Sequence, residues 1–195
     1  MGQYYKAVLI SDDGVKIAHP HYFNNGLKLM EHSWIGNDFV NAVLKHVDNT
    51  PTRIAWIGDY ADGLESQEYC FADGYVNDRD EFMKFYKYAW GDEKINMIDY
   101  SFGSYMLDER HADCYIVNLT RNSYIDMEKY VAKNAKDGWC VNPLPLLTAV
   151  GNGRGCGDYR GEDACNSVGS WAFDKIYVTA LKPRDIAEVM YTFQE

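Results

Sequence analysis

The residues best suited to chemistry in this 195-residue chain lie in one glycine-rich segment near its C-terminal end. Positions 151–161 read Gly-Asn-Gly-Arg-Gly-Cys-Gly-Asp-Tyr-Arg-Gly and hold five of the 16 glycines. Glycines at this density let the backbone take positive φ angles and turn its N–H groups toward an anion. With a nearby tryptophan, the segment supplies the candidate ligand-binding residues Gly153, Arg154, Gly155, Cys156, Gly157, Asp158, Arg160 and Trp171.

The segment matches neither standard phosphate-binding motif. A P-loop requires Gly-Lys-Ser/Thr after four intervening residues, and the nearby cation, Arg154, is in the wrong register. The dinucleotide pattern GxGxxG is broken at Cys156 and at Arg160, and the residues before the segment have the pattern of a helix rather than a strand. Two interpretations stay open: an anion held by backbone N–H groups with Arg154 or Arg160, or a tight structural loop packed under Trp171.

Other reactive residues complete no catalytic or metal-binding motif. A nucleophilic Cys156 needs a histidine base, and all five histidines lie far from it in the sequence. His19 and His21 would share one side of an extended segment, as metal ligands often do, and Glu31, His32 or Asp59 could complete a site in the fold. The other interpretation is a hydrated turn after the first hairpin. Two ligands are not a site, so no metal and no cofactor are predicted. Carboxylate pairs for acid–base catalysis could be drawn from Asp59, Asp62, Asp158 and Asp174, so the question of enzymatic activity stays open.

Charge and composition narrow the choice of partner. The formal net charge is −10 and the pI is near 4.9, which argues against binding free nucleic acid through phosphates. Aromatic residues make up 15% of the chain, with 16 Tyr and five Trp, and such side chains suit surfaces that are half buried on binding. A basic surface on another protein, or a small anionic ligand, is therefore the expected partner.

The expected compartment is the cytoplasm. No positively charged start with an apolar run opens the chain, and no window approaches the roughly 18 apolar residues of a membrane helix. The five cysteines are odd in number and include no CxxC pair, which disfavours a disulfide framework and a zinc knuckle.

The strands and helices that must position these residues can be predicted from sequence patterns. The patterns predict one α+β domain over 1–195, with a mostly antiparallel sheet, an N-terminal hairpin and several packed helices. The hairpin is indicated by β-prone runs around Ser11-Asp12-Asp13-Gly14. Strands are expected at 4–10, 15–18, 53–57, 114–119, 123–126 and 174–180. Helices are expected at 37–47, from Asp80 to Gly91, at 127–135, after the prolines at 143 and 145, and from Pro183 to Met190.

Three segments together carry a resemblance to a known group of proteins: 26–34, 117–126, and the glycine-rich segment followed by Gly-Ser-Trp at 169–171. They resemble an uncharacterised family found in bacteria and their mobile elements, with a GNGRGxGDY…GSW motif. The resemblance spans most of the chain and implies no catalytic residue, because the family has no established activity. Cys156 interrupts a longer glycine run in that pattern, which weakens the case for a required thiol.

Two functions of different classes follow. The first is a non-enzymatic binding protein whose acidic, aromatic surface occupies a basic site on a host or defence protein, as a phage or mobile-element inhibitor would. The second is a nucleotide- or phosphosugar-binding protein or hydrolase that uses the glycine-rich segment 151–161.

Overall fold

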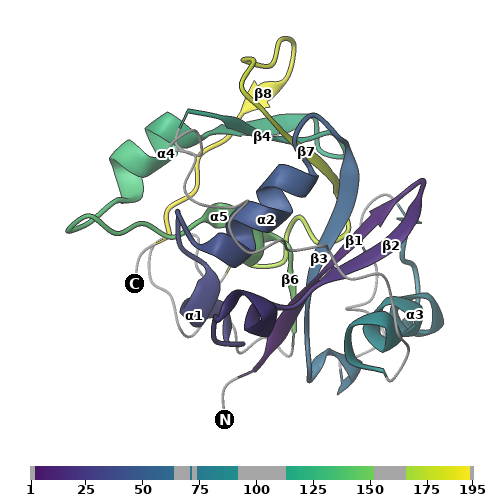
Figure 1. The fold of residues 1–195 in the computed structure, drawn as a ribbon. Coiled ribbons are helices and arrows are strands. Elements are labelled where there is room, and N and C mark those ends of the chain that lie inside the picture. The colour runs from purple at the N-terminus through teal and green to yellow at the C-terminus, as the bar shows by residue number, and fades with distance from the viewer. Residues whose placement is uncertain (1–2, 64–70, 72–73, 92–112, 152–165, 194–195) are drawn as a thin grey trace.

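The computed structural model describes residues 3–63, 71, 74–91, 113–151 and 166–193. These residues build one eight-stranded, mostly antiparallel sheet with helices on both of its faces, which confirms the predicted α+β class (Figure 1). The strand order is β2-β1-β3-β7-β4-β5-β8, and β6 pairs separately with β3. Most of the candidate loop falls outside the described residues, but the strand that leads into it and the chain that follows it are described.

The N-terminal hairpin forms as predicted. Strand β1 (Tyr5–Ser11) pairs antiparallel with β2 (Gly14–Ala18), and Ser11 faces Gly14 across a two-residue turn. Gly14 has a φ of +121°, a backbone conformation that side chains rarely adopt, so the turn depends on a glycine there. On its other side β1 pairs antiparallel with β3 (Thr52–Gly58).

The rest of the sheet comes from the C-terminal half of the chain. Strand β7 (Lys175–Thr179) pairs antiparallel with β3 and with β4 (Tyr115–Asn118), which forms the second predicted hairpin with β5 (Ser123–Asp126). Two short strands are parallel to their neighbours: β6 (Ala149–Val150) to β3, and β8 (Ala187–Glu188) to β5. Chain segments more than a hundred residues apart therefore meet on β3.

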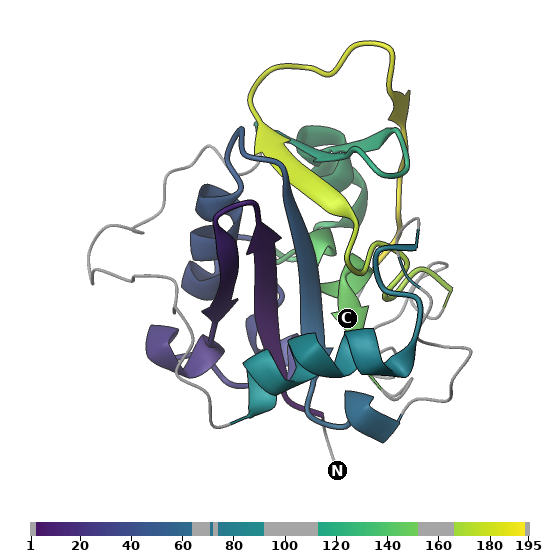
Figure 2. The same ribbon diagram turned by 90° about the vertical axis from the view of Figure 1, so that its right-hand side faces the viewer.

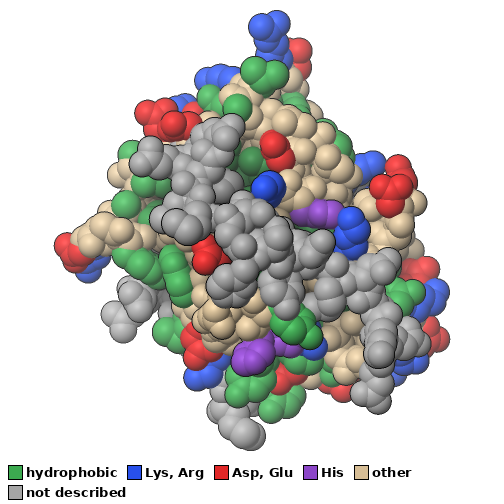
Figure 3. Space-filling model, viewed as in Figure 1, with side chains coloured by type: hydrophobic (Ala, Val, Ile, Leu, Met, Phe, Trp, Pro, Cys, Tyr) green, Lys and Arg blue, Asp and Glu red, His purple; other side chains and the backbone are tan. Residues whose placement is uncertain are grey.

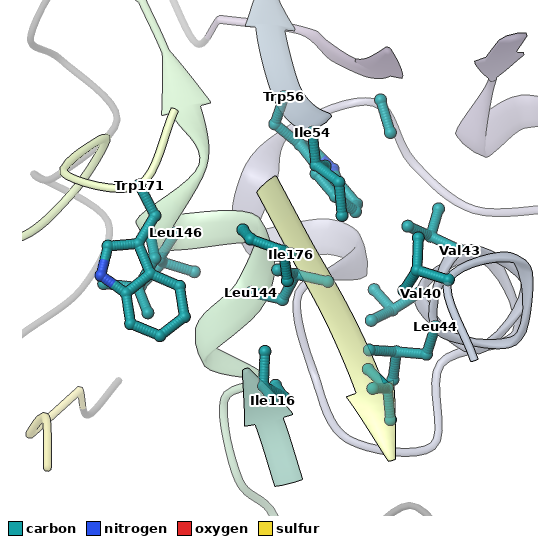
Figure 4. Packing of buried hydrophobic residues seen from close by; sticks show 14 of the residues in the cluster. Val40, Val43, Leu44, Ile54, Trp56, Ile116, Leu144, Leu146, Trp171 and Ile176 are labelled. Atoms are coloured by element: carbon teal, nitrogen blue, oxygen red, sulfur yellow. The ribbon is translucent and has the colours of Figure 1, made fainter. Parts of the chain in front are cut away.

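Helix α2 (Asp38–His46) covers one face of the sheet. Asn37 caps it, because its Oδ1 accepts hydrogen bonds from the backbone N–H groups of Phe39 and Val40. The apolar side of α2 packs against β3 and β7, and α5 (Pro143–Leu147) joins the same core (Figure 4). Shorter elements complete this face: η1 (Pro20–Phe23), α1 (Leu29–His32) and α4 (Met127–Asn134).

Helix α3 (Arg79–Trp90) lies on the opposite face, beside the short η2 (Ala61–Gly63). Asp78 caps it by accepting a hydrogen bond from the N–H of Glu81, and Gly91 ends it as predicted. Its buried Phe82 packs with Ala55 and Ile57 of β3 in a second hydrophobic cluster. Figure 2 shows α3 crossing the lower part of the sheet and leaving β7 uncovered by any drawn helix on that side.

Two predictions about local structure are wrong. Residues 183–190 form no helix: Asp185 takes a φ of +59°, and β8 pairs with β5, where Glu188 accepts hydrogen bonds from Tyr124 and Lys129. Ala149 and Val150 continue no helix either, because α5 ends at Leu147 and the next residues pair with β3. Within the described parts of the chain, no helix is long and apolar enough to cross a membrane.

Candidate functional site

The structure describes only one of the predicted ligand-binding residues, Trp171. The remaining candidates lie outside the described residues: Gly153, Arg154, Gly155, Cys156, Gly157, Asp158 and Arg160. Their role in binding stays a prediction. The geometry on either side of them is described, and it defines where this segment leaves the sheet and where the chain returns to it.

Trp171 is a core residue. It is 1% exposed and lies among the buried side chains around α5, close to Leu146 in Figure 4. Its indole Nε1–H donates to the Tyr191 hydroxyl at 3.1 Å, and its backbone N–H donates to the Leu147 carbonyl. The two rings meet edge to face, 5.9 Å apart. These contacts fix Trp171 against the chain that precedes and follows the glycine-rich segment.

The glycine-rich segment leaves the sheet at a tightly packed junction. Gly151 follows β6, and Gly58 ends β3, so the carboxyl ends of two parallel strands meet there. The side chain of Gln3 lies against both glycines, and the Tyr5 hydroxyl donates to its Oε1 at 2.9 Å. A Cβ atom at Gly58 or at Gly151 would overlap the end of the Gln3 side chain, so a larger residue at either position would have to displace Gln3.

Beyond Gly58 the chain forms a surface that we call the β3 edge: Tyr4, Asp59, Tyr60 and Asp62. Two hydrogen bonds join Tyr4 to Asp59, from the Tyr4 N–H to Oδ1 at 3.0 Å and from the Asp59 N–H to the Tyr4 carbonyl at 2.9 Å. Tyr4 and Tyr60 are each 43% exposed, among the most exposed large side chains described. The β3 edge therefore contains two exposed tyrosines and two aspartates, with Tyr4 joined to Asp59 through its backbone.

Burial and the carboxylates of the β3 edge raise the pKa of a neighbouring tyrosine hydroxyl. Tyr86 of α3 donates its phenolic O–H to the Asp59 carbonyl at 2.8 Å. Burial raises the pKa of Tyr86, and the nearby charges of Asp62 and Asp59 raise it further. Two carboxylates therefore lie near the Tyr86 hydroxyl, and the Arg79 guanidinium lies beside them, 3.5 Å from the Asp62 carbonyl oxygen.

Other charges are not segregated in this way. On the face seen in Figure 3, acidic and basic side chains are interspersed. The net charge of −10 therefore produces no single acidic field on that face, and a specific acidic site must be sought in local clusters such as the β3 edge.

The histidine pair lies in a 3₁₀ turn, as the turn interpretation expects, and not on an extended segment. His19 caps η1, and its Nδ1 accepts the N–H of His21 at 3.2 Å. Burial lowers the pKa of His19 to about 4, and the nearby charges of Lys6 and His21 add to this. Within the described residues no group of three or more His, Cys, Asp or Glu side chains is placed to hold a metal ion.

His32, a possible third ligand for that pair, is fully buried. His32 lies under α2, where its Nε2 accepts the indole N–H of Trp56 at 3.2 Å, so its Nδ1 carries the proton and donates to the Gly26 carbonyl at 3.1 Å. Burial lowers the pKa of His32 to about 4. The ring is neutral at pH 7 and joins two elements of the core, so its role is structural.

Two cysteines and one aspartate with reactive side chains are also buried in the fold. Burial raises the pKa of the Cys114 thiol to about 12 and that of Cys140 to about 11, so both stay protonated and weakly nucleophilic at pH 7. The carboxylate of Asp174 is buried and accepts hydrogen bonds from Asn118 at 2.7 Å and from Arg121 at 2.6 Å.

The predicted set of catalytic carboxylates does not come together among the described residues. Asp174 pairs through its backbone with Ile54, five residues before Asp59 on β3. At a strand rise of about 3.3 Å per residue, this separation is roughly 16 Å, which is too far for two carboxyl groups to share one reacting bond. Asp59 and Asp62 do lie together, and Asp158 is outside the described residues.

Comparisons with protein-family models, with curated proteins and with solved structures found no match. The resemblance drawn from the sequence motifs therefore stays a prediction.

Proposed function

We propose that this chain is a non-enzymatic binding protein that holds a basic segment of another protein at the β3 edge. The observation that carries this proposal is that the exposed Tyr4 and Tyr60 occur at the same end of β3 as Asp59 and Asp62, with Tyr4 bonded to Asp59 through its backbone. Aromatic faces attract the cationic groups of Lys and Arg, and carboxylates accept their N–H groups. Acidic, aromatic surfaces of this kind are complementary to basic protein segments.

The position of the β3 edge on the fold also supports binding. Asp59 follows the central strand β3, and its backbone is held from two sides, by Tyr4 of the N-terminal segment and by Tyr86 of α3. A rigid base reduces the conformational entropy that is lost when a partner binds. In a bacterial host, where the motif resemblance would place the chain, the partner would be a host or defence protein and the site of action the cytoplasm.

A titration with an arginine-rich synthetic peptide tests the proposal. Tyr60→Ala and Asp62→Asn should each weaken binding about two- to fivefold, because one exposed cation–π or charge contact contributes about 0.5–1 kcal/mol. Tyr60→Phe, which keeps the ring, should bind as the wild type does. Binding should also weaken as salt is added, since exposed charges are screened.

Two matched variants serve as controls for this titration. Tyr22 is exposed to the same degree as Tyr60, at 44%, and Asp13 lies exposed in the β1–β2 turn. Tyr22→Ala and Asp13→Asn should leave peptide binding unchanged. Equal losses in the control variants and the β3-edge variants would mean that the peptide responds only to net charge, and the proposal would be rejected.

A second candidate function rests on the junction before the glycine-rich segment. The carboxyl ends of parallel β3 and β6 meet there, at two glycines that pack against the Gln3 side chain. Such strand ends are a common place for ligands in sheets with parallel strands. Arg154 follows Gly151 by three residues, a separation that a chain spans by about 11 Å at most, so a nucleotide or phosphosugar near this junction is within its reach.

A thermal-shift screen with nucleotides and sugar phosphates distinguishes the two candidate functions. A ligand at 100 times its dissociation constant stabilises a protein by roughly 2.7 kcal/mol. Stabilisation that Arg154→Ala removes and Tyr60→Ala leaves intact would favour the small-ligand function. No stabilisation by any compound in the screen would reject it.

A further inference from the structure

The start of β3 carries basic side chains, whereas the β3 edge at the other end of the strand carries carboxylates. Arg53 on β3 and Lys175 on β7 are direct partners in the antiparallel register. Both side chains lie on the α3 face, because the alternating residues Ile54 and Ile176 are buried in the core under α2. Directly opposed residues on one sheet face have Cβ atoms about 5 Å apart, so two cationic side chains leave the sheet side by side there.

No carboxylate compensates this pair among the described residues. None of the ion pairs found there includes Arg53 or Lys175. The nearest carboxylate along the chain, Asp174, has its buried side chain bonded to Asn118 and Arg121. Like charges directly opposed on a sheet destabilise it, so this arrangement costs free energy unless an anion lies between them.

Arg53 is held in place before any ligand binds. Its Nη1 donates to the Phe173 carbonyl at 2.9 Å, and its guanidinium lies 4.1 Å from the centre of the Tyr75 ring. Phe173 has a φ of +61°, a strained conformation for a residue with a large side chain, and this turn directs the carbonyl toward Arg53. The Nε and Nη2 groups of Arg53 have no hydrogen-bond partner within the described parts of the chain.

A further donor lies on the same face of β7. Tyr177 follows Lys175 by two residues on β7, so its side chain is on the same face, and its hydroxyl has no hydrogen-bond partner in the described ranges. Lys175 is exposed and Tyr177 partly so. In Figure 2 no helix covers β7 on this side, since α3 crosses below it.

We propose that Arg53, Lys175 and Tyr177 form a binding site for a phosphate group, carried by a small molecule. A planar guanidinium with an open edge binds two phosphate oxygens at once, while an ammonium and a hydroxyl donate to the remaining oxygens. The site is independent of the β3 edge. Six residues of strand, about 20 Å, separate Arg53 from Asp59.

A titration with inorganic phosphate, at constant ionic strength against chloride, tests this site through the backbone amide signals in NMR spectra. We expect saturable changes at residues 53 and 173–177. Lys175→Gln should weaken phosphate binding about three- to tenfold, as expected for one exposed charge-assisted hydrogen bond. Lys133→Gln removes the same charge from an exposed position on α4 and should have no effect.

A charge reversal separates binding from stability. Lys175→Glu would pair with Arg53, so it should raise the midpoint of urea unfolding while abolishing phosphate binding. Arg53→Lys keeps the charge but loses the two-pronged geometry and should also weaken binding. The absence of saturable changes in the wild type, or an equal loss in Lys133→Gln, would overturn the proposal. Failure of Tyr60→Ala to affect peptide binding would leave it untouched.

Discussion

Acidification should destabilise this protein, and the largest histidine contribution should come from one fully buried ring, His32. In the folded state burial lowers its pKa from 6.5 to about 4, and the ring accepts a hydrogen bond from Trp56 that protonation would break. The unfolded chain therefore binds the proton first as the pH falls. Stability from this group is complete above pH 6.5 and declines as the pH falls toward 4.

The magnitude follows from the difference between the two pKa values. One pH unit corresponds to 1.36 kcal/mol per proton, and the unfolded ring is already half protonated at pH 6.5, so between pH 6.5 and pH 5 the free energy of unfolding should fall by about 1.6 kcal/mol. Urea unfolding of the wild type and of His32→Gln at several pH values would measure this. The variant should be less stable at pH 7 and should lose most of the slope.

Two other histidines act in the same direction and need a control. Burial lowers the pKa of His19 and of His46, and both are half exposed, so their contribution is smaller. His19→Gln should keep most of the wild-type slope. If His32→Gln had the same dependence on pH as the wild type between pH 6.5 and 5, the assignment of a neutral buried ring would be refuted.

Three further substitutions test the packing around the candidate sites by urea unfolding. Asn37→Ala removes the cap of α2 and should cost about 1–2 kcal/mol, whereas Asn37→Ser, which keeps a capping oxygen, should cost less. Tyr191→Phe leaves the buried indole N–H of Trp171 without its acceptor and should cost about 1–3 kcal/mol; an unchanged stability would show that this hydrogen bond contributes nothing. Gly151→Ala should cost about 1–3 kcal/mol through its overlap with Gln3, and Gln3→Ala should recover part of the loss if that overlap is the cause.

The elements with strong local signals could be predicted from the sequence. Helix α2 was predicted because Asn37 supplies a cap and the apolar residues after it follow a helical period. The N-terminal hairpin was predicted from its turn, where Gly14 has the positive φ angle that the turn requires. In both cases residues close in sequence determine the local structure.

Elements determined by distant contacts could not be predicted. Pro183 has the local signal of a helix start, yet β8 forms because Glu188 binds Lys129 and Tyr124 of another hairpin and helix. A two-residue strand such as β6 has no periodicity of its own and exists because it pairs with β3. Local sequence patterns do not show which distant segment a short strand will pair with.

The same limit applies to the sites. The sequence drew attention to local glycine density, whereas the surfaces on which the proposals rest combine residues far apart in the chain. Tyr4 meets Asp59 across 55 residues, and Arg53 faces Lys175 because two strands pair. His32 and Trp56 are 24 residues apart, and no sequence motif around them predicts their hydrogen bond.

Amide chemical-shift mapping of the arginine-rich peptide tests the central claim most directly, because it locates the binding surface without any substitution. We predict saturable shifts at Tyr4 and at residues 59–63, with little change in α4 or in the β1–β2 turn. Shifts confined to other elements, or small shifts spread over all acidic surfaces without saturation, would contradict binding at the β3 edge.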